Sequence, residues 1–196
     1  MSTPRLTFTL DVLGWRPWVE TVDDVGISPE QEALLEEVVP ATTGRPYYAT
    51  LAHDVPALRE RTKLFKAIMY GAGGVRRADR ELAAVSTARV NGCVYCASVH
   101  ARLFAQLTKD VPAVQRLLDE GVEVEQAERE RAVIDYAVKL TREPDTLTAD
   151  DLAPLRKLGL SDGEILDISH ATAMFAWANR LMQTLGEPER PAAAPG

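Results

Sequence analysis

Apolar residues recur every three or four positions through most of the chain after residue 28, which is the spacing of helices that bury one face. Residues 28–31 (SPEQ) and 161–164 (SDGE) read as capping boxes, and Asp54 stands where it can cap another helix. The glycines within residues 71–74 and the Asn91-Gly92 pair predict breaks between helices. With no convincing run of paired strands, the pattern predicts an all-α, compact bundle of about eight helices.

The two ends of the chain lack this pattern. Residues 1–27 carry two prolines, two tryptophans and no helical period, so we expect an irregular arm that packs or extends onto a neighbour. Gly44 and Pro46 predict a turn between helices. Residues 187–196 (EPERPAAAPG) are expected to form a disordered tail, which leaves one helical domain at residues 28–186.

Composition narrows the partners and the location. A chain of 196 residues that is 46% apolar suffices for one sizeable core. The net charge of −7 and the scattered basic residues give no positive face, so nucleic acid is not an expected partner. No apolar run approaches the roughly 20 residues that span a bilayer, and the first residues do not read as a signal peptide. We expect a cytoplasmic protein that has no membrane partner.

The candidate chemistry lies at the start of one predicted helix. Cys93 and Cys96 are the only cysteines and follow directly on the break at residues 91–92. Free N–H groups and the helix dipole stabilise a thiolate at such a position. At about 100° per residue, Cys93, Cys96 and His100 fall within about 60° on one helix face. The two thiols can form a disulfide and His100 can act as a base, oriented by Glu81 if packing brings the two together.

A zinc site is the main chemical alternative, since Cys93, Cys96, His100 and Glu81 include four candidate ligands. Structural zinc sites usually add a second C-x-x-C or an H-x3–5-H pair, and the sequence has neither. In a reducing cytoplasm a lone C-x-x-C indicates redox chemistry or metal binding. The constellation therefore favours a redox-active dithiol that uses no metal and no cofactor.

This constellation resembles the AhpD-type alkylhydroperoxidase branch of the carboxymuconolactone decarboxylase superfamily. The matching positions are Glu81, Ser86, Cys93, Tyr95, Cys96 and His100. Residues 47–107 are similar to a group of uncharacterised peroxidase-related proteins, and the C-terminal EILDISHATAMFAWANRL fits more loosely. Tyr95 is a departure, because AhpD itself has a histidine between its cysteines.

The resemblance implies an all-α homo-oligomer and a cysteine-based peroxidase that needs no metal or haem. In that scheme Cys96 is the peroxidatic thiol, Cys93 closes the disulfide, and Glu81 with His100 forms the proton relay. A hydroperoxide is the implied substrate. A protein or a dihydrolipoyl-type dithiol is the implied electron donor that reduces the disulfide.

Other functions remain open. The same dithiol would serve a general disulfide reductase or a redox sensor, and the wider superfamily contains decarboxylases that do not rely on the cysteine pair.

The sequence also contains a weak internal repeat. Aligning Glu164 with Glu81 places Asn179 where Cys96 stands, so a second copy of the motif would have lost its chemistry.

Overall fold

The computed structural model describes residues 7–38 and 44–190. Within these ranges the chain forms ten α-helices, two short 3₁₀ helices and one pair of short strands. In chain order they are β1 (Gly14–Pro17), α1 (Val22–Val25), α2 (Pro29–Val38), α3 (Arg45–Leu51), α4 (Val55–Tyr70), α5 (Arg77–Asn91), α6 (Val94–Thr108), α7 (Val111–Glu120), α8 (Glu128–Arg142), η1 (Pro144–Thr146), η2 (Ala149–Leu152), α9 (Ala153–Lys157), α10 (Asp162–Thr184) and β2 (Gly186–Glu189). The all-α prediction is confirmed.

The predicted helix caps are present. The Ser28 hydroxyl accepts a hydrogen bond from the Gln31 backbone N–H at 3.2 Å, and the Gln31 side chain accepts one from the Ser28 backbone at 2.9 Å. Ser161 and Glu164 make the same reciprocal pair at the start of α10. The Asp54 side chain accepts a backbone hydrogen bond at the start of α4. These bonds satisfy N–H groups that a helix leaves without internal partners.

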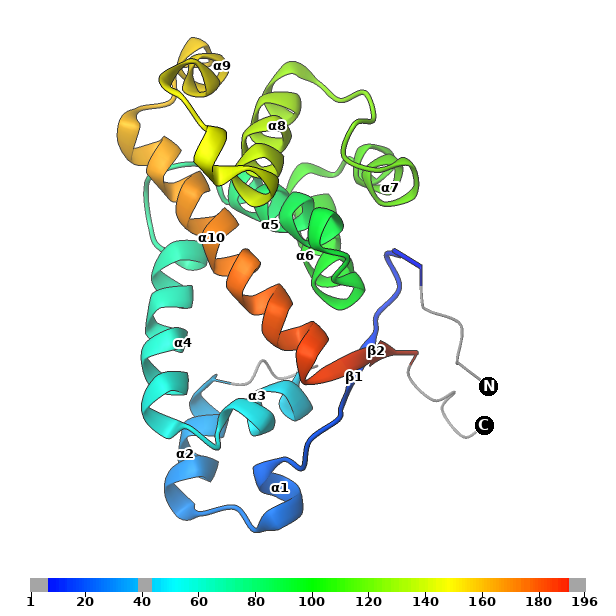
Figure 1. Cartoon of the computed structure of the whole chain (residues 1–196), viewed down its shortest axis with the longest axis vertical. Coiled ribbons are helices and arrows are strands. Elements are labelled where there is room, and N and C mark those ends of the chain that lie inside the picture. Colours follow the sequence, from blue (N-terminus) through cyan, green and yellow to red (C-terminus); the bar gives the residue numbers. More distant parts are fainter. Residues whose placement is uncertain (1–6, 39–43, 191–196) are drawn as a thin grey trace.

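Helix α5 lies at the centre of the fold. It packs against α6, α8 and α10, and Figure 1 shows α10 crossing the molecule beside α5 and α6 with α4 on its other side. Residues 82–88 (LAAVSTA) are buried all round the helix, as expected for a core helix. Ser86 and Thr87 satisfy their hydroxyls by donating to carbonyls one turn earlier, each at 2.8 Å. Small side chains let the neighbouring helices approach α5 closely.

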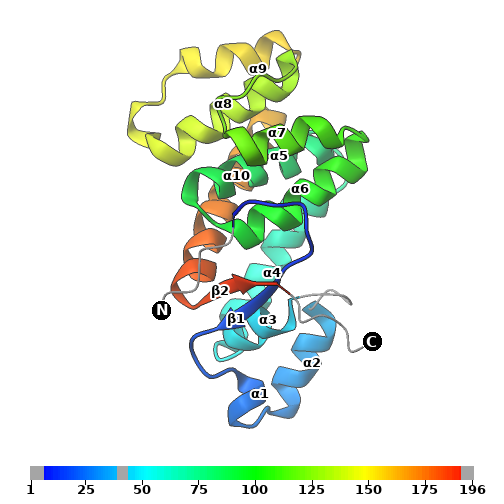
Figure 2. The same cartoon turned by 90° about the vertical axis from the view of Figure 1, so that its right-hand side faces the viewer.

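A second, smaller apolar cluster lies under the N-terminal helices. It is formed by Val22, Leu34, Leu35, Val38, Ala49, Ala52 and Leu58. Figure 2 shows α1 and α2 at the opposite end of the molecule from α8 and α9. The two cysteines belong to the main cluster, which α5, α6 and α10 share.

Where the structure describes them, the predicted arm packs but contains a short strand and a short helix, and the first residues of the predicted tail form a strand. Strands β1 and β2 pair antiparallel, with Gly14 opposite Glu189, and α1 follows β1. Trp15 is 3% exposed, its indole N–H donates to the Met182 carbonyl at 3.0 Å, and its ring lies 5.4 Å from that of Tyr47. This long-range packing fixes segments that have no local helical signal. Residues 1–6 and 191–196 lie outside the described residues.

The predicted turn at residues 44–46 is also different. Gly44 adopts a φ of 109°, and α3 begins at the next residue with Pro46 in its first turn. Proline suits that position because its missing N–H would be unpaired there in any residue. Helix α3 carries Tyr47 and Tyr48 toward the cluster that contains the cysteines. Across residues 7–38 and 44–190, no helix is long and apolar enough to cross a bilayer.

Candidate active site

A glycine turn places the cysteines at a helix start. Gly92 takes a φ of 77°, which residues with a side chain rarely adopt, and its N–H closes the last turn of α5 on the Ala88 carbonyl. The N–H of Cys93 also bonds to the Ala88 carbonyl, at 2.9 Å. Cys93 is consequently the residue that caps α6, and Cys96 lies in the first turn of that helix. Both predicted positions are confirmed.

Cys93 and Cys96 form a buried pair of free thiols, 2% and 6% exposed. The side-chain hydrogen bond from Cys96 lowers the pKa of Cys93 against the opposing effect of burial, and the backbone N–H of Cys96 lowers it further. The same sulfur contact raises the pKa of Cys96 well above its usual value, with burial acting in the same direction. The reduced pair thus holds its first negative charge on Cys93 and its remaining proton on Cys96.

Glu81 and His100 are in direct contact. The His100 Nδ1 lies 2.5 Å from the Glu81 Oε2, and the Arg77 Nε donates to the Glu81 Oε1 at 2.5 Å. Burial alone would raise the pKa of the fully buried Glu81 carboxyl, but the charges and hydrogen bonds of His100 and Arg77 outweigh it and lower that pKa. An ionised Glu81 keeps the proton on Nδ1, so Nε2 of His100 is left to exchange a proton.

His100 stands four residues after Cys96 on α6, and its ring packs edge-on against Phe175 at 4.2 Å. Its side chain is 8% exposed, and its Nε2 makes no hydrogen bond to another described residue. Helical spacing therefore places this nitrogen one turn from Cys96 on the same face. The structure joins Glu81 to His100 and Cys93 to Cys96 as the sequence predicts.

Sequence reasoning did not assign a site role to Asn179 of α10. Asn179 is fully buried, and its Oδ1 accepts from Asn91 at 3.1 Å. The Asn179 side chain lowers the pKa of both Cys93 and Cys96, after the larger effects of the sulfur contact and burial. The weak internal repeat, which places Asn179 at the position of Cys96, was the sequence signal available for this residue.

Tyr47 and Arg61 were also missed. Burial raises the pKa of the Tyr47 phenol and the Arg61 charge partly offsets this, while Arg61 also acts to lower the pKa of Cys96. Arg61 belongs to α4 and Tyr47 to α3, so neither element adjoins the cysteine motif in sequence. Tertiary packing alone brings them to the sulfurs.

Within residues 7–38 and 44–190, no three His, Cys, Asp or Glu side chains are arranged to hold a metal ion, so these residues do not support the zinc alternative.

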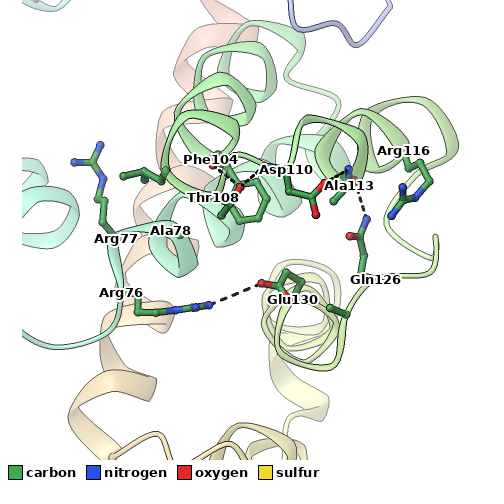
Figure 3. A pocket seen from close by; sticks show the side chains of 12 residues that line it. Arg76, Arg77, Ala78, Phe104, Thr108, Asp110, Ala113, Arg116, Gln126 and Glu130 are labelled. Atoms are coloured by element: carbon green, nitrogen blue, oxygen red, sulfur yellow. Dashed lines mark hydrogen bonds and ion pairs between the residues drawn. The ribbon is translucent and has the colours of Figure 1, made fainter.

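A cavity of about 650 Å³ lies away from the cysteines, between the start of α5, the end of α6, α7 and the start of α8. Figure 3 shows Arg76 reaching across it toward Glu130, and Arg77 is among its lining residues. Neither cysteine lines this cavity.

The part of the chain that carries this site is similar to a known family. The model of the carboxymuconolactone decarboxylase family matches residues 56–139, a stretch that includes Glu81, both cysteines and His100. Over residues 56–139 the chain is similar to the carboxymuconolactone decarboxylase family. No protein with a curated description matches it.

Solved structures share the fold of this chain. An AhpD-core, uncharacterized peroxidase-related protein from Ralstonia eutropha JMP134 is 24% identical with a TM-score of 0.72, and the match covers 89% of this chain and 90% of that one. An uncharacterized peroxidase-related protein from Silicibacter sp. TM1040 is 25% identical with a TM-score of 0.72, over 89% of this chain and 94% of that one.

The same fold occurs in a debrominase. The debrominase Bmp8, solved as a cysteine-to-alanine variant in complex with 2,3,4-tribromopyrrole, is 16% identical with a TM-score of 0.63, over 86% of this chain and 87% of that one. The same fold thus occurs in proteins whose names describe different chemistry. Because the fold alone does not select one reaction, the function depends on the side chains of the site.

Proposed function

We propose that this protein is a thiol-dependent peroxidase that reduces organic hydroperoxides through a Cys93–Cys96 dithiol and disulfide cycle. The observation that carries the proposal is the adjacency of two groups on one helix: a buried thiol pair that stabilises a thiolate, and a histidine held by a buried carboxylate. A thiolate is needed to break an O–O bond, and a positioned base is needed to move the accompanying protons.

The chemistry balances without a cofactor. A cysteine thiolate attacks the terminal oxygen of the hydroperoxide, the S–O bond forms, the O–O bond breaks, and an alcohol leaves after it takes one proton. The sulfur is then a sulfenic acid. The second cysteine thiol displaces hydroxide from it, which leaves as water, and a disulfide forms. A dithiol donor reduces this disulfide to two thiols and is itself oxidised to a disulfide.

Cys96 is the proposed attacking sulfur, and Cys93 the sulfur that closes the disulfide. Cys96 is the more exposed of the two and stands one turn from His100. Because the resting proton lies on Cys96, attack requires its transfer to the Cys93 thiolate or to Nε2 of His100. The protonated His100, stabilised by Glu81, would then donate to the leaving alkoxide.

The partners and setting of this cycle are part of the proposal. A protein dithiol or a dihydrolipoyl-type dithiol would be the donor, the protein would act as a homo-oligomer, and the cytoplasm would be its compartment. A lone dithiol needs a reducing environment to return to its starting state.

General disulfide reduction is a second candidate, favoured by the lowered pKa of Cys93 at the start of α6. A thiolate at a helix start attacks disulfides as readily as peroxides, and Cys96 would then resolve the mixed disulfide. The two functions differ in the attacking residue: Cys96 for the peroxidase and Cys93 for the reductase.

The test is steady-state consumption of cumene hydroperoxide with dihydrolipoamide as donor. We expect turnover in the unmodified protein, none in Cys96→Ser, and a loss of about 10²-fold or more in His100→Gln. The matched control is His170→Gln, because His170 is exposed on α10. In Cys93→Ser, a dimedone-reactive sulfenic acid should accumulate on Cys96. Turnover of disulfides without consumption of hydroperoxide would replace the peroxidase with the reductase.

A further inference from the structure

Arg61 carries a buried positive charge that no carboxylate neutralises. It is 9% exposed, and it forms no ion pair with any described residue. Every Asp and Glu of the chain lies in the described ranges, because residues 1–6, 39–43 and 191–196 contain none. A buried charge is costly unless it is paired, so an anionic ligand that reached Arg61 would lower this cost.

The groups around Arg61 leave hydrogen-bonding capacity unused. Its Nη1 lies 3.4 Å from the Tyr48 hydroxyl, a long contact, and its Nε has no partner. The buried hydroxyl of Tyr47, which the Arg61 charge affects, also has no partner among the described residues. Buried donors of this kind are normally satisfied. The Arg61 Nε and the Tyr47 hydroxyl, on the neighbouring helices α4 and α3, are thus two donors that an acceptor from a ligand would satisfy.

The surroundings of Arg61 are aromatic and lead to the proposed active site. The guanidinium carbon lies 4.6 Å from the centre of the Phe65 ring, Phe65 lies 6.1 Å from Phe175, and Phe175 lies 4.2 Å from His100. Tyr47 packs in the same apolar cluster as Cys93 and Cys96. A ligand bound to Arg61 would therefore lie against apolar rings, with its other end directed to the sulfurs.

We propose that Arg61, with the Tyr47 hydroxyl, binds the carboxylate of an organic hydroperoxide whose apolar body packs on Phe65 and Phe175 and whose O–O bond reaches Cys96. This substrate class rests on the peroxidase function proposed above. The planar guanidinium suits a carboxylate because it offers two parallel N–H donors. The aromatic rings suit a hydrocarbon body rather than hydrogen peroxide, which has none.

The first test compares matched hydroperoxides in a single turnover. Cumene hydroperoxide carrying a para-carboxylate should oxidise the reduced protein about ten- to a hundredfold faster than the methyl ester of the same compound, the range expected for a charge-assisted contact. The ratio of the two rates is the readout, because any effect of Arg61 on the thiolate itself cancels. Arg61→Gln should bring the ratio near one, and Tyr47→Phe should lower it less.

The control variant is Arg59→Gln on the same helix, whose side chain is 42% exposed and pairs with Glu30 at 3.2 Å. It should keep the unmodified ratio. Arg61→Gln should fold, since it removes a buried charge that has no partner; circular dichroism checks this. Arg61→Lys is the second variant, and it should retain part of the ratio because it keeps the charge but loses the planar fork.

A binding measurement separates this inference from the peroxidase proposal. Calorimetric titration of the reduced protein with 4-isopropylbenzoate should show binding that its methyl ester lacks and that Arg61→Gln abolishes. If that holds while no hydroperoxide oxidises the thiols, the anion site stands and the peroxidase function fails. If the rate ratio is near one in the unmodified protein, or survives in Arg61→Gln, or if 4-isopropylbenzoate does not bind, the inference is overturned.

Discussion

Replacing the buried carboxylate with its amide, Glu81→Gln, should destabilise the fold because it removes a charge that two other groups require. The Glu81 carboxylate is fully buried and accepts from Arg77 and His100, each at 2.5 Å. A hydrogen bond to a charged group contributes about 1.5 to 3 kcal/mol. The Arg77 side chain is 29% exposed, so water replaces part of its bond, whereas the His100 side chain is only 8% exposed.

The expected cost of Glu81→Gln is about 2 to 4 kcal/mol of unfolding free energy, since glutamine keeps the shape and one acceptor oxygen. In a chain of this size, that lowers the thermal midpoint by about 4 to 16 °C. Chemical denaturation followed by tryptophan fluorescence gives the free energy, with the thiols kept reduced throughout.

The matched control is Glu60→Gln on α4, where the side chain is 70% exposed and pairs with Lys63 at 2.7 Å. That change should stay within about 0.5 kcal/mol. If Glu81→Gln also stays within that margin, Glu81 is not an ionised partner of His100, and the proton relay built on it is refuted.

Three further outcomes follow. The pKa of Glu81 is lowered in the folded protein, so its carboxylate stabilises the fold fully above the ordinary pKa of 4.5. This stabilisation is lost as the pH falls through the lower folded pKa. The difference in unfolding free energy between the unmodified protein and Glu81→Gln should therefore shrink below pH 4.5. Gly186→Ala would place a methyl group against the Trp15 ring and the Arg16 carbonyl, and denaturation should show a loss of about 1 to 3 kcal/mol; an unchanged midpoint would contradict the strand pairing. Trp15→Phe leaves the Met182 carbonyl without its indole donor and should cost about 1 to 3 kcal/mol in the same assay.

Local signals in the sequence predicted the parts of this fold that local interactions determine. Caps such as Ser28 and Asp54, and the glycine break at residue 92, act within a few residues, so the helices and the cysteine position follow from them. The face shared by Cys93, Cys96 and His100 follows from helical spacing.

Long-range packing decided the rest. Gly14 and Glu189 pair across almost the whole chain in strands that contain proline, so no local pattern marks them. Asn179 and Arg61 reach the sulfurs from α10 and α4, which follow or precede the motif by tens of residues. Arg77 is the exception: its position four residues before Glu81 on one helix was a readable signal for an ion pair.

The most direct test of the central claim is stopped-flow oxidation of the reduced protein by cumene hydroperoxide, with thiol counting and intact mass at each time. The account predicts a rapid second-order loss of both thiols and a product lighter by two hydrogens, the Cys93–Cys96 disulfide, with no disulfide in Cys96→Ser. Thiols that stay reduced under excess hydroperoxide, yet exchange readily with a small disulfide, would contradict it.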